Sequence, residues 1–216
     1  MKESKEIVLY HGSENIIERP QFGIGNKYND YGLGFYTTPV RALAAEWAVP
    51  KDDVDGYVNA YRLNLEGLKI LDLDEEPFEH WISILIQNRK GRYAEAAMER
   101  QQKWLAKFPF SIEGYDVVKG WRADDSYFSF VRDFFDVGLS LENLTTAMKL
   151  GGLGVQYCLV TEESINRLEF IHPPELIQGT TFYAKRQSRD NEARNAYRAM
   201  RNKARGTTIY HMVGED

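Results

Sequence analysis

Three short segments, far apart in the 216-residue chain, carry the residue types that could hold a nucleotide. The first is an apolar run that ends in His11, Gly12 and Ser13. A histidine at the end of a strand can hydrogen-bond a hydroxyl group, and a glycine beside it lets the backbone approach a ligand closely. The segment therefore predicts a contact with a sugar, although a histidine in such a place is more often structural.

The other two segments contribute an aromatic ring and an amide. A glycine-rich turn that includes Gly34 leads into a β-prone stretch containing Tyr36, whose ring could stack on a flat heterocycle. The third segment, residues 155–160, is an apolar strand with Gln156 near its start. Each segment alone is a weak signal, because Tyr36 would usually be a core residue and Gln156 a solvated strand-edge residue.

Local patterns predict the elements that must position these segments. Thr38 and Pro39 predict an N-cap and first helical position for a helix that ends near Ala48. Further strands are expected over 57–65, 69–73, 115–118, 155–160 and 168–171, the last ended by Pro173-Pro174, and helices over 78–108 (broken near Gly91), 126–135 and 140–150, with one turn after Thr161. Strands and helices are mixed without strict alternation, which favours an α+β fold.

In their order, the three segments resemble the His-Tyr-Glu signature of ADP-ribosyltransferases of the diphtheria-toxin and poly-ADP-ribose polymerase type. The resemblance covers roughly residues 7–171, including an alanine-rich helix at 42–48. It is close to a bacterial branch that shares the segments 115–120 and 123–125 and has glutamine at the third motif. It implies a split β-sandwich with helical insertions that binds NAD in a cleft between two sheets, and the NAD-contacting residues it implies are His11, Gly12, Ser13, Gly34 and Tyr36.

The resemblance also implies roles. His11 would contact the nicotinamide ribose, the Gly12 backbone would hold the carboxamide, and Tyr36 would stack on the nicotinamide ring. At the third motif the family has a glutamate, which bonds the ribose 2′-hydroxyl and stabilises the oxocarbenium-like transition state with its charge. Gln156 keeps an acceptor but lacks that charge.

Three outcomes follow from the glutamine. The domain binds NAD or ADP-ribose without chemistry, or it is slow but sufficient, or another carboxylate enters the cleft. The candidates for that carboxylate are Asp124 and Asp125, and we assign Asp125 as a catalytic residue with His11, Tyr36 and Gln156. The alternative for both aspartates is a helix N-cap and a first-turn acid.

The C-terminal part of the chain differs in charge from the rest. Residues 185–205 carry eight basic and two acidic residues, whereas the remaining 19 basic and 30 acidic residues give −11. Four arginines lie on one face of the expected helix, and they are Arg194, Arg198, Arg201 and Arg205. The apolar stripe beside them, which includes Tyr197, would dock on the body. The ridge could bind the phosphates of a nucleic acid or of NAD, or be a solvated face paired with the acidic body. We therefore expect an NAD-binding domain over residues 1–175 and a basic helical extension over 176–216 packed on it.

Composition narrows the class of protein. Hydrophobic residues make up 43% and charged residues 27%, as in globular proteins. One cysteine, Cys158, and four scattered histidines provide no zinc spacing, so we expect no metal. The charged N-terminus and the lack of a long apolar stretch predict a cytoplasmic protein with no membrane segment.

The leading hypothesis is an enzyme that transfers ADP-ribose from NAD to a protein or nucleic-acid acceptor and releases nicotinamide. For the bacterial branch we expect a role as a toxin or phage-defence effector, with an antitoxin as a partner. The alternatives are a module that only binds NAD or ADP-ribose, and an NAD glycohydrolase with water as the acceptor.

Overall fold

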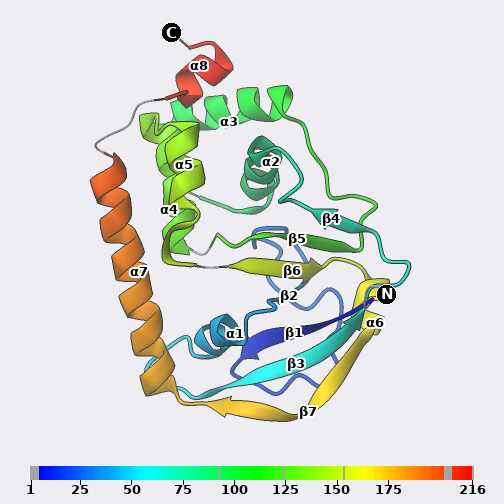
Figure 1. Cartoon of the computed structure of the whole chain (residues 1–216). Helices are drawn as coiled ribbons and strands as arrows, with labels where there is room; N and C mark the ends of the chain where they lie inside the picture. Colours follow the sequence, from blue (N-terminus) through cyan, green and yellow to red (C-terminus); the bar gives the residue numbers. More distant parts are fainter. Residues whose placement is uncertain (1–4, 92, 124, 153, 202–205, 216) are drawn as a thin grey trace.

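The described residues of the computed structural model form seven strands in two sheets, one above the other in Figure 1. The structure describes residues 5–91, 93–123, 125–152, 154–201 and 206–215, with the backbone alone at 125, 126 and 151. The first sheet is antiparallel, and its order is β1 (Glu6–Ser13), β3 (Gly56–Asn64) and β7 (Leu168–Ile177). In the second sheet only the β4–β5 pair is parallel, and its order is β2 (Phe35–Thr37), β6 (Val155–Leu159), β5 (Val117–Trp121) and β4 (Ile70–Asp72).

The two sheets are joined where β1 meets the end of β2. The backbone N–H of Tyr10 donates to the carbonyl of Thr38 at 2.8 Å, and the reverse bond is 2.9 Å. Above the junction the sheets share an apolar cluster, whose members are Leu9, Phe35, Tyr61, Leu63, Val117, Leu159 and Ile165. This cluster holds the facing surfaces of the two sheets together.

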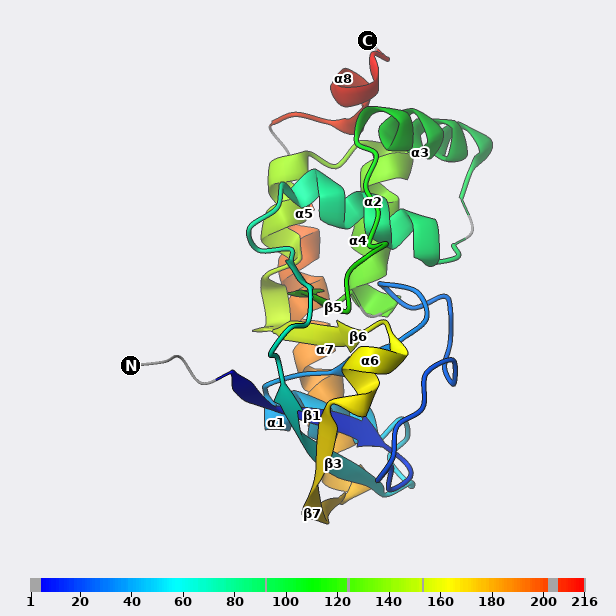
Figure 2. The ribbon, with the colours of Figure 1, turned by 90° about the vertical axis from the view of Figure 1, so that its right-hand side faces the viewer.

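Helices surround the sheets on two sides. They are α1 (Arg41–Ala48), α2 (Phe78–Asn88), α3 (Glu95–Lys107), α4 (Asp125–Val137), α5 (Leu141–Ala147), α6 (Glu162–Asn166), α7 (Gly179–Arg201) and α8 (Ile209–Val213). α2 to α5 lie beyond the four-stranded sheet, as the side view shows (Figure 2), and their aromatic residues form the largest core cluster. α1 packs on the three-stranded sheet through its alanines, and α7 runs along one side of the molecule, from β7 to α5 (Figure 1). The fold is α+β, as the mixed pattern predicted.

Signals local to one segment were confirmed. The predicted break near Gly91 separates α2 from α3. The Ser140 hydroxyl accepts from the N–H of Asn143 at 3.2 Å and caps α5, and Thr161 caps α6 with a capping box. These helices begin where the sequence places a side-chain acceptor for their free N–H groups.

Several boundary predictions were wrong. The first strand continues through His11, Gly12 and Ser13 instead of ending before them, and the strand predicted over 115–118 covers Val117–Trp121. Two further boundaries differ for clear structural reasons. Thr38 does not cap α1, which begins at Arg41 after the N-cap Val40. The Thr38 hydroxyl instead donates a hydrogen bond to the Val155 carbonyl of the second sheet, at 2.9 Å. The last strand does not end at Pro173-Pro174 but continues to Ile177, because β7 is an edge strand and a register shift between Val58 and Ala60 accommodates the prolines.

Candidate functional site

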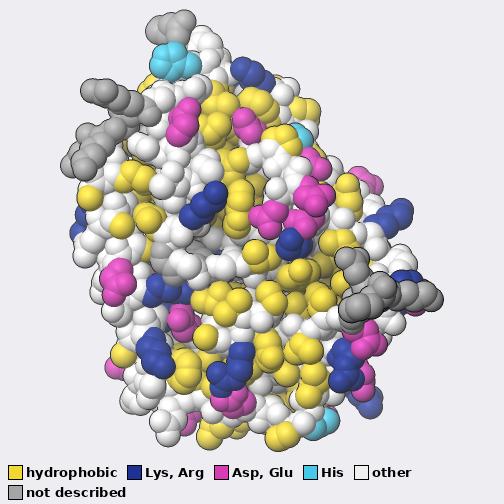
Figure 3. Space-filling view, in the orientation of Figure 1, with side chains coloured by type: hydrophobic (Ala, Val, Ile, Leu, Met, Phe, Trp, Pro, Cys, Tyr) yellow, Lys and Arg dark blue, Asp and Glu magenta, His cyan; other side chains and the backbone are white. Residues whose placement is uncertain are grey.

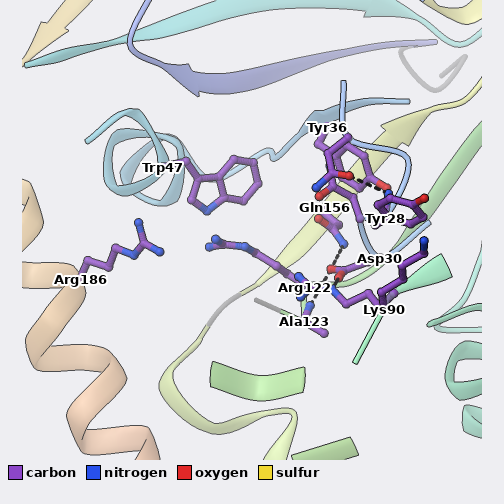
Figure 4. A pocket seen from close by; sticks show the side chains of 12 residues that line it. Tyr28, Asp30, Tyr36, Trp47, Lys90, Arg122, Ala123, Gln156 and Arg186 are labelled. Atoms are coloured by element: carbon purple, nitrogen blue, oxygen red, sulfur yellow. Dashed lines mark hydrogen bonds and ion pairs between the residues drawn. The ribbon is translucent and has the colours of Figure 1, made fainter. Parts of the chain in front are cut away.

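A cavity of about 510 Å³ brings together side chains from seven parts of the chain. Its volume is within the range of small-molecule sites. Figure 4 shows it beside α1 and α7, and its lining residues are Asn26, Tyr28, Asn29, Asp30, Tyr36, Trp47, Arg89, Lys90, Arg122, Ala123, Gln156 and Arg186. Two residues named from the sequence, Tyr36 and Gln156, are among them.

Gln156 lies near the start of β6, and only 3% of its surface is exposed. Its Nε2 donates to the Asp30 carboxylate at 2.9 Å and to the Trp121 carbonyl at 3.2 Å. Since a carbonyl oxygen can only accept, these bonds fix which end of the amide is nitrogen. The amide oxygen is therefore directed to the opposite side and has no partner among the described residues, so it remains an acceptor for a hydroxyl group.

Asp30 is the acidic residue among the described residues that line the cavity, and no local sequence pattern predicts its role. It precedes β2 in a loop, and only 4% of it is exposed. One carboxylate oxygen accepts from Arg89 Nε at 2.7 Å, and the other accepts from the Ala123 N–H at 2.8 Å and from Gln156. Burial raises the pKa of the Asp30 carboxyl, and Arg89 and the two N–H donors limit that rise by stabilising the ionised form. The replacement carboxylate sought at Asp124 and Asp125 thus has a third candidate in Asp30.

The other two candidate aspartates belong to the segment that follows β5. Asp124 lies outside the described residues, and Asp125 is described by its backbone alone, at the first position of α4. Ala123, just before them, donates its N–H to Asp30. The segment that follows β5 therefore contributes to the cavity at least through its backbone.

Tyr36 extends from β2 into the cavity wall. Its hydroxyl donates to the Gly32 carbonyl at 2.7 Å and accepts from the Tyr31 N–H at 2.9 Å. The two tyrosine rings lie parallel, 6.4 Å apart between centroids. Burial raises the pKa of Tyr36, so the phenol is neutral at physiological pH. Its hydroxyl is fully used, which holds the ring in a fixed orientation beside Gln156 (Figure 4).

His11 lies between the two sheets, next to Tyr36 in space but outside the set of lining residues. Its Nδ1 is 2.7 Å from the Tyr36 carbonyl, and its ring is 4.5 Å from that of Phe35. Burial lowers the pKa of His11, and the carbonyl requires a proton on Nδ1. The imidazole is therefore neutral with Nε2 as an acceptor, which suits a hydroxyl group that donates a hydrogen bond.

Packing explains Gly12 and Gly34, and a local hydrogen bond occupies Ser13. A Cβ on Gly12 would collide with the Ala44 carbonyl of α1, and one on Gly34 would come within 2.5 Å of Cys158 Sγ. The N–H and C=O groups of Gly12 point to the same edge of β1 as those of Tyr10, which is the edge facing the second sheet. The Ser13 hydroxyl accepts from the Asn15 N–H at 3.1 Å. Gly12, Ser13 and Gly34 do not line the cavity.

Besides Arg89, three further cationic side chains line the cavity. Arg122 lies over the Trp47 ring at 4.6 Å, and Arg186 reaches in from α7 (Figure 4). Lys90 lies over the Tyr28 ring at 4.1 Å. Trp47 Nε1 is buried and has no hydrogen-bond partner among the described residues. With Asp30 paired to Arg89, the lining favours an anionic ligand.

The predicted arginine ridge of α7 is separate from this cavity. Arg194 and Arg198 are exposed, Arg201 pairs with Asp133 at 3.1 Å, and Arg205 lies outside the described residues. Ala193 and Tyr197 are buried, as the stripe predicted. On the face in Figure 3 the basic side chains over the lower half stand among acidic ones and form no continuous stripe. Arg186, which was not part of the ridge, is the arginine of α7 that lines the cavity.

The described part of the chain contains no group of three or more histidine, cysteine, aspartate or glutamate side chains placed to hold a metal ion. No helix within it has the length and apolar character needed to cross a bilayer.

Comparison with known proteins identifies the family. Residues 7–170, most of the chain, match the family described as "Protein of unknown function (DUF3990)". The chain belongs to this family. The matched region includes every cavity residue except Arg186, so the site is built almost entirely from the part that defines the DUF3990 family. No curated protein and no solved structure matches the chain.

Proposed function

We propose that the cavity binds NAD and that the protein transfers ADP-ribose from it to a macromolecular acceptor, with release of nicotinamide. The observation that carries the proposal is the oriented amide of Gln156, which lines the same cavity as the fixed Tyr36 ring. An acceptor next to an aromatic wall suits a ribose attached to a flat heterocycle. The sequence resemblance implies the same pair of residues for NAD.

The chemistry needs few groups from the protein. The bond between ribose C1′ and the nicotinamide nitrogen breaks, and its electron pair leaves with nicotinamide. Positive charge develops on the ribose, and the acceptor atom then bonds to C1′ and loses a proton. Hydrogen-bond acceptors at the ribose hydroxyls stabilise that developing charge more than the ground state. Gln156 Oε1 would be one of them, and neutral His11 Nε2, which the sequence resemblance assigns to the ribose, would act from just outside the cavity lining.

The cationic side of the cavity suits the rest of NAD. Arg122 and Arg186 would bind the pyrophosphate, which guanidinium groups hold with paired donors. The indole N–H of Trp47, which has no acceptor among the described residues, could donate to a phosphate oxygen. The same cations also suit a nucleic-acid acceptor, which brings further phosphates to the cavity mouth.

A second function, binding without transfer, is favoured by one specific observation. Gln156 carries no charge, and the only nearby carboxylate, among the described residues that line the cavity, is paired with Arg89. A site without a full negative charge at the ribose loses a few kcal/mol of transition-state stabilisation, roughly a hundred- to thousand-fold in rate.

The experiment measures NAD affinity by calorimetry and nicotinamide release by chromatography, with bulk cellular protein, with RNA, and without an acceptor. We expect binding, with release that increases with one acceptor class. Binding without release identifies the binding module, and release that no acceptor increases identifies a glycohydrolase. Tyr36→Ala should abolish binding, whereas Tyr57→Ala, in β3 and outside the cavity lining, should not. Wild-type protein that binds neither NAD nor ADP-ribose overturns the proposal.

A further inference from the structure

We infer that Asp30 is a positioning residue for Gln156: it orients the amide and places behind it the negative charge that the glutamine lacks. The inference rests on the proposed function and deepens it, since it assigns a role at the same site. Both side chains are buried. Asp30 is 126 positions from Gln156 in sequence, yet the two side chains meet at 2.9 Å inside the protein.

The amide has no freedom to turn over. Its two N–H groups are used by the Asp30 carboxylate and the Trp121 carbonyl, both of which accept. Rotating the amide by half a turn would place its oxygen against two acceptors. The Gln156 oxygen is therefore held on the side away from Asp30, toward the cavity that Tyr36 also lines (Figure 4).

The loop that carries Asp30 is itself held in place. Arg89 Nε and the Ala123 N–H donate to the carboxylate at 2.7 and 2.8 Å, so both oxygens are oriented before any ligand arrives. Asn88, from the end of α2, occupies the space that a side chain on Gly32 would need, and Gly32 has a φ of +77°. Asp30 is thus a fixed group rather than a mobile loop side chain.

The contact has an electrostatic consequence. A carboxylate that accepts from an amide N–H shifts electron density toward the amide oxygen, and hydrogen bonds in a chain polarise one another in this way. The oxygen aimed at the ribose then carries more negative charge than that of an isolated glutamine. The family resemblance places one carboxylate on the strand, and here the charge lies one hydrogen bond behind it, on the loop before β2.

Exchanging the two groups tests the inference. Asp30→Asn removes the charge, and Gln156→Glu alone places two carboxylates in contact. Each single variant should lower the rate of nicotinamide release roughly 10- to 100-fold while changing the NAD dissociation constant less than about threefold, because the lost interaction acts mainly in the transition state. The double variant Asp30→Asn/Gln156→Glu restores an amide–carboxylate pair with the charge on the strand. It should recover the wild-type rate or exceed it.

Asp116→Asn is the matched control. That carboxylate also accepts from a backbone N–H, of Lys69 at 2.9 Å, and from the Thr161 hydroxyl, but it lies before β5 and does not line the cavity. Its activity should equal that of the wild type. Thermal unfolding of each variant separates a loss of rate from a loss of folded protein.

The outcomes separate the two proposals. If the wild type binds NAD and releases nicotinamide but the double variant shows the product of the two single losses, Asp30 has only a structural role. If the wild type binds NAD without releasing nicotinamide, the double variant should acquire release, and failure to do so overturns the role of Asp30. Wild-type protein that neither binds nor cleaves NAD overturns the proposed function and this inference with it.

Discussion

At the scale of single residues, backbone carbonyl oxygens fix the direction of the hydrogen bonds in the site, because a carbonyl oxygen can only accept. The Tyr36 carbonyl makes His11 carry its proton on Nδ1, and the Trp121 carbonyl makes Gln156 turn its nitrogen inward. Gln156 then keeps an acceptor oxygen at the cavity, and His11 keeps an acceptor on Nε2 just outside the cavity lining. The tyrosine hydroxyl, by contrast, is used up by Gly32 and Tyr31. Tyr36 therefore contributes a ring surface and His11 and Gln156 contribute lone pairs.

His11 makes the stability of the protein depend on pH. Burial lowers its pKa in the folded state below the ordinary value of 6.5, so the unfolded chain binds more protons between the two values. The neutral imidazole contributes its stabilisation in full above pH 6.5, and this is lost as the pH falls through the window below that value. Each tenfold difference in proton affinity corresponds to about 1.4 kcal/mol.

We expect the free energy of unfolding of the wild type to decrease relative to His11→Gln as the pH falls from about 7 to 5. Urea unfolding at several pH values measures this difference, in which the contributions of the other histidines cancel. A difference between the two proteins that stays constant over this range would contradict the buried, neutral state of His11.

At the scale of elements, the arginines of α7 lie in two different environments, the cavity and the exposed surface. Arg186 lines the cavity, whereas Arg198 is exposed on the far part of the helix. If Arg186 binds a phosphate of NAD, Arg186→Ala should weaken NAD binding roughly tenfold, since hydrogen bonds to charged groups contribute about 1.5–3 kcal/mol. Arg198→Ala, on the same helix, should leave it unchanged. Titration calorimetry at low and moderate salt measures both, and an equal effect of the two changes would argue against a phosphate site at Arg186.

Features that depend on neighbouring residues could be predicted from the sequence, whereas features that depend on contacts between distant elements could not. The helix break near Gly91 and the caps at Ser140 and Thr161 depend on neighbouring residues, so a single segment contains the whole signal. Asp30 could not be found in this way, because an aspartate between an asparagine and a tyrosine resembles any polar loop residue. Its role arises only when the loop meets β6 and α2. The extension of β7 through two prolines likewise depends on its position at the edge of the sheet.

At the scale of the whole molecule, α7 contacts both the three-stranded sheet with its helix α1 and the helices beyond the four-stranded sheet. Its first turn lies against the residues before β3, its middle contacts α1, and its last turns pack on α4 and α5 (Figure 1). The ring of Tyr197 stacks on Phe130 at 3.9 Å between centroids, and its hydroxyl donates to Asp133 at 2.7 Å. The helix that carries Arg186 is therefore anchored in the helical layer, away from the cavity.

This anchoring predicts that a change distant from the cavity weakens NAD binding. Tyr197→Ala removes a buried aromatic ring and should destabilise the protein by about 3 kcal/mol, or lower its Tm by roughly 6 to 12 °C. Because the end of α7 is then less firmly held, Arg186 should be less well positioned and NAD binding weaker. Tyr197→Phe keeps the stacked ring, so it should retain NAD affinity and most of the stability. Thermal unfolding with and without NAD measures both effects. Equal stabilisation by NAD of the Ala variant and the wild type would show that the cavity is complete without a firmly docked helix.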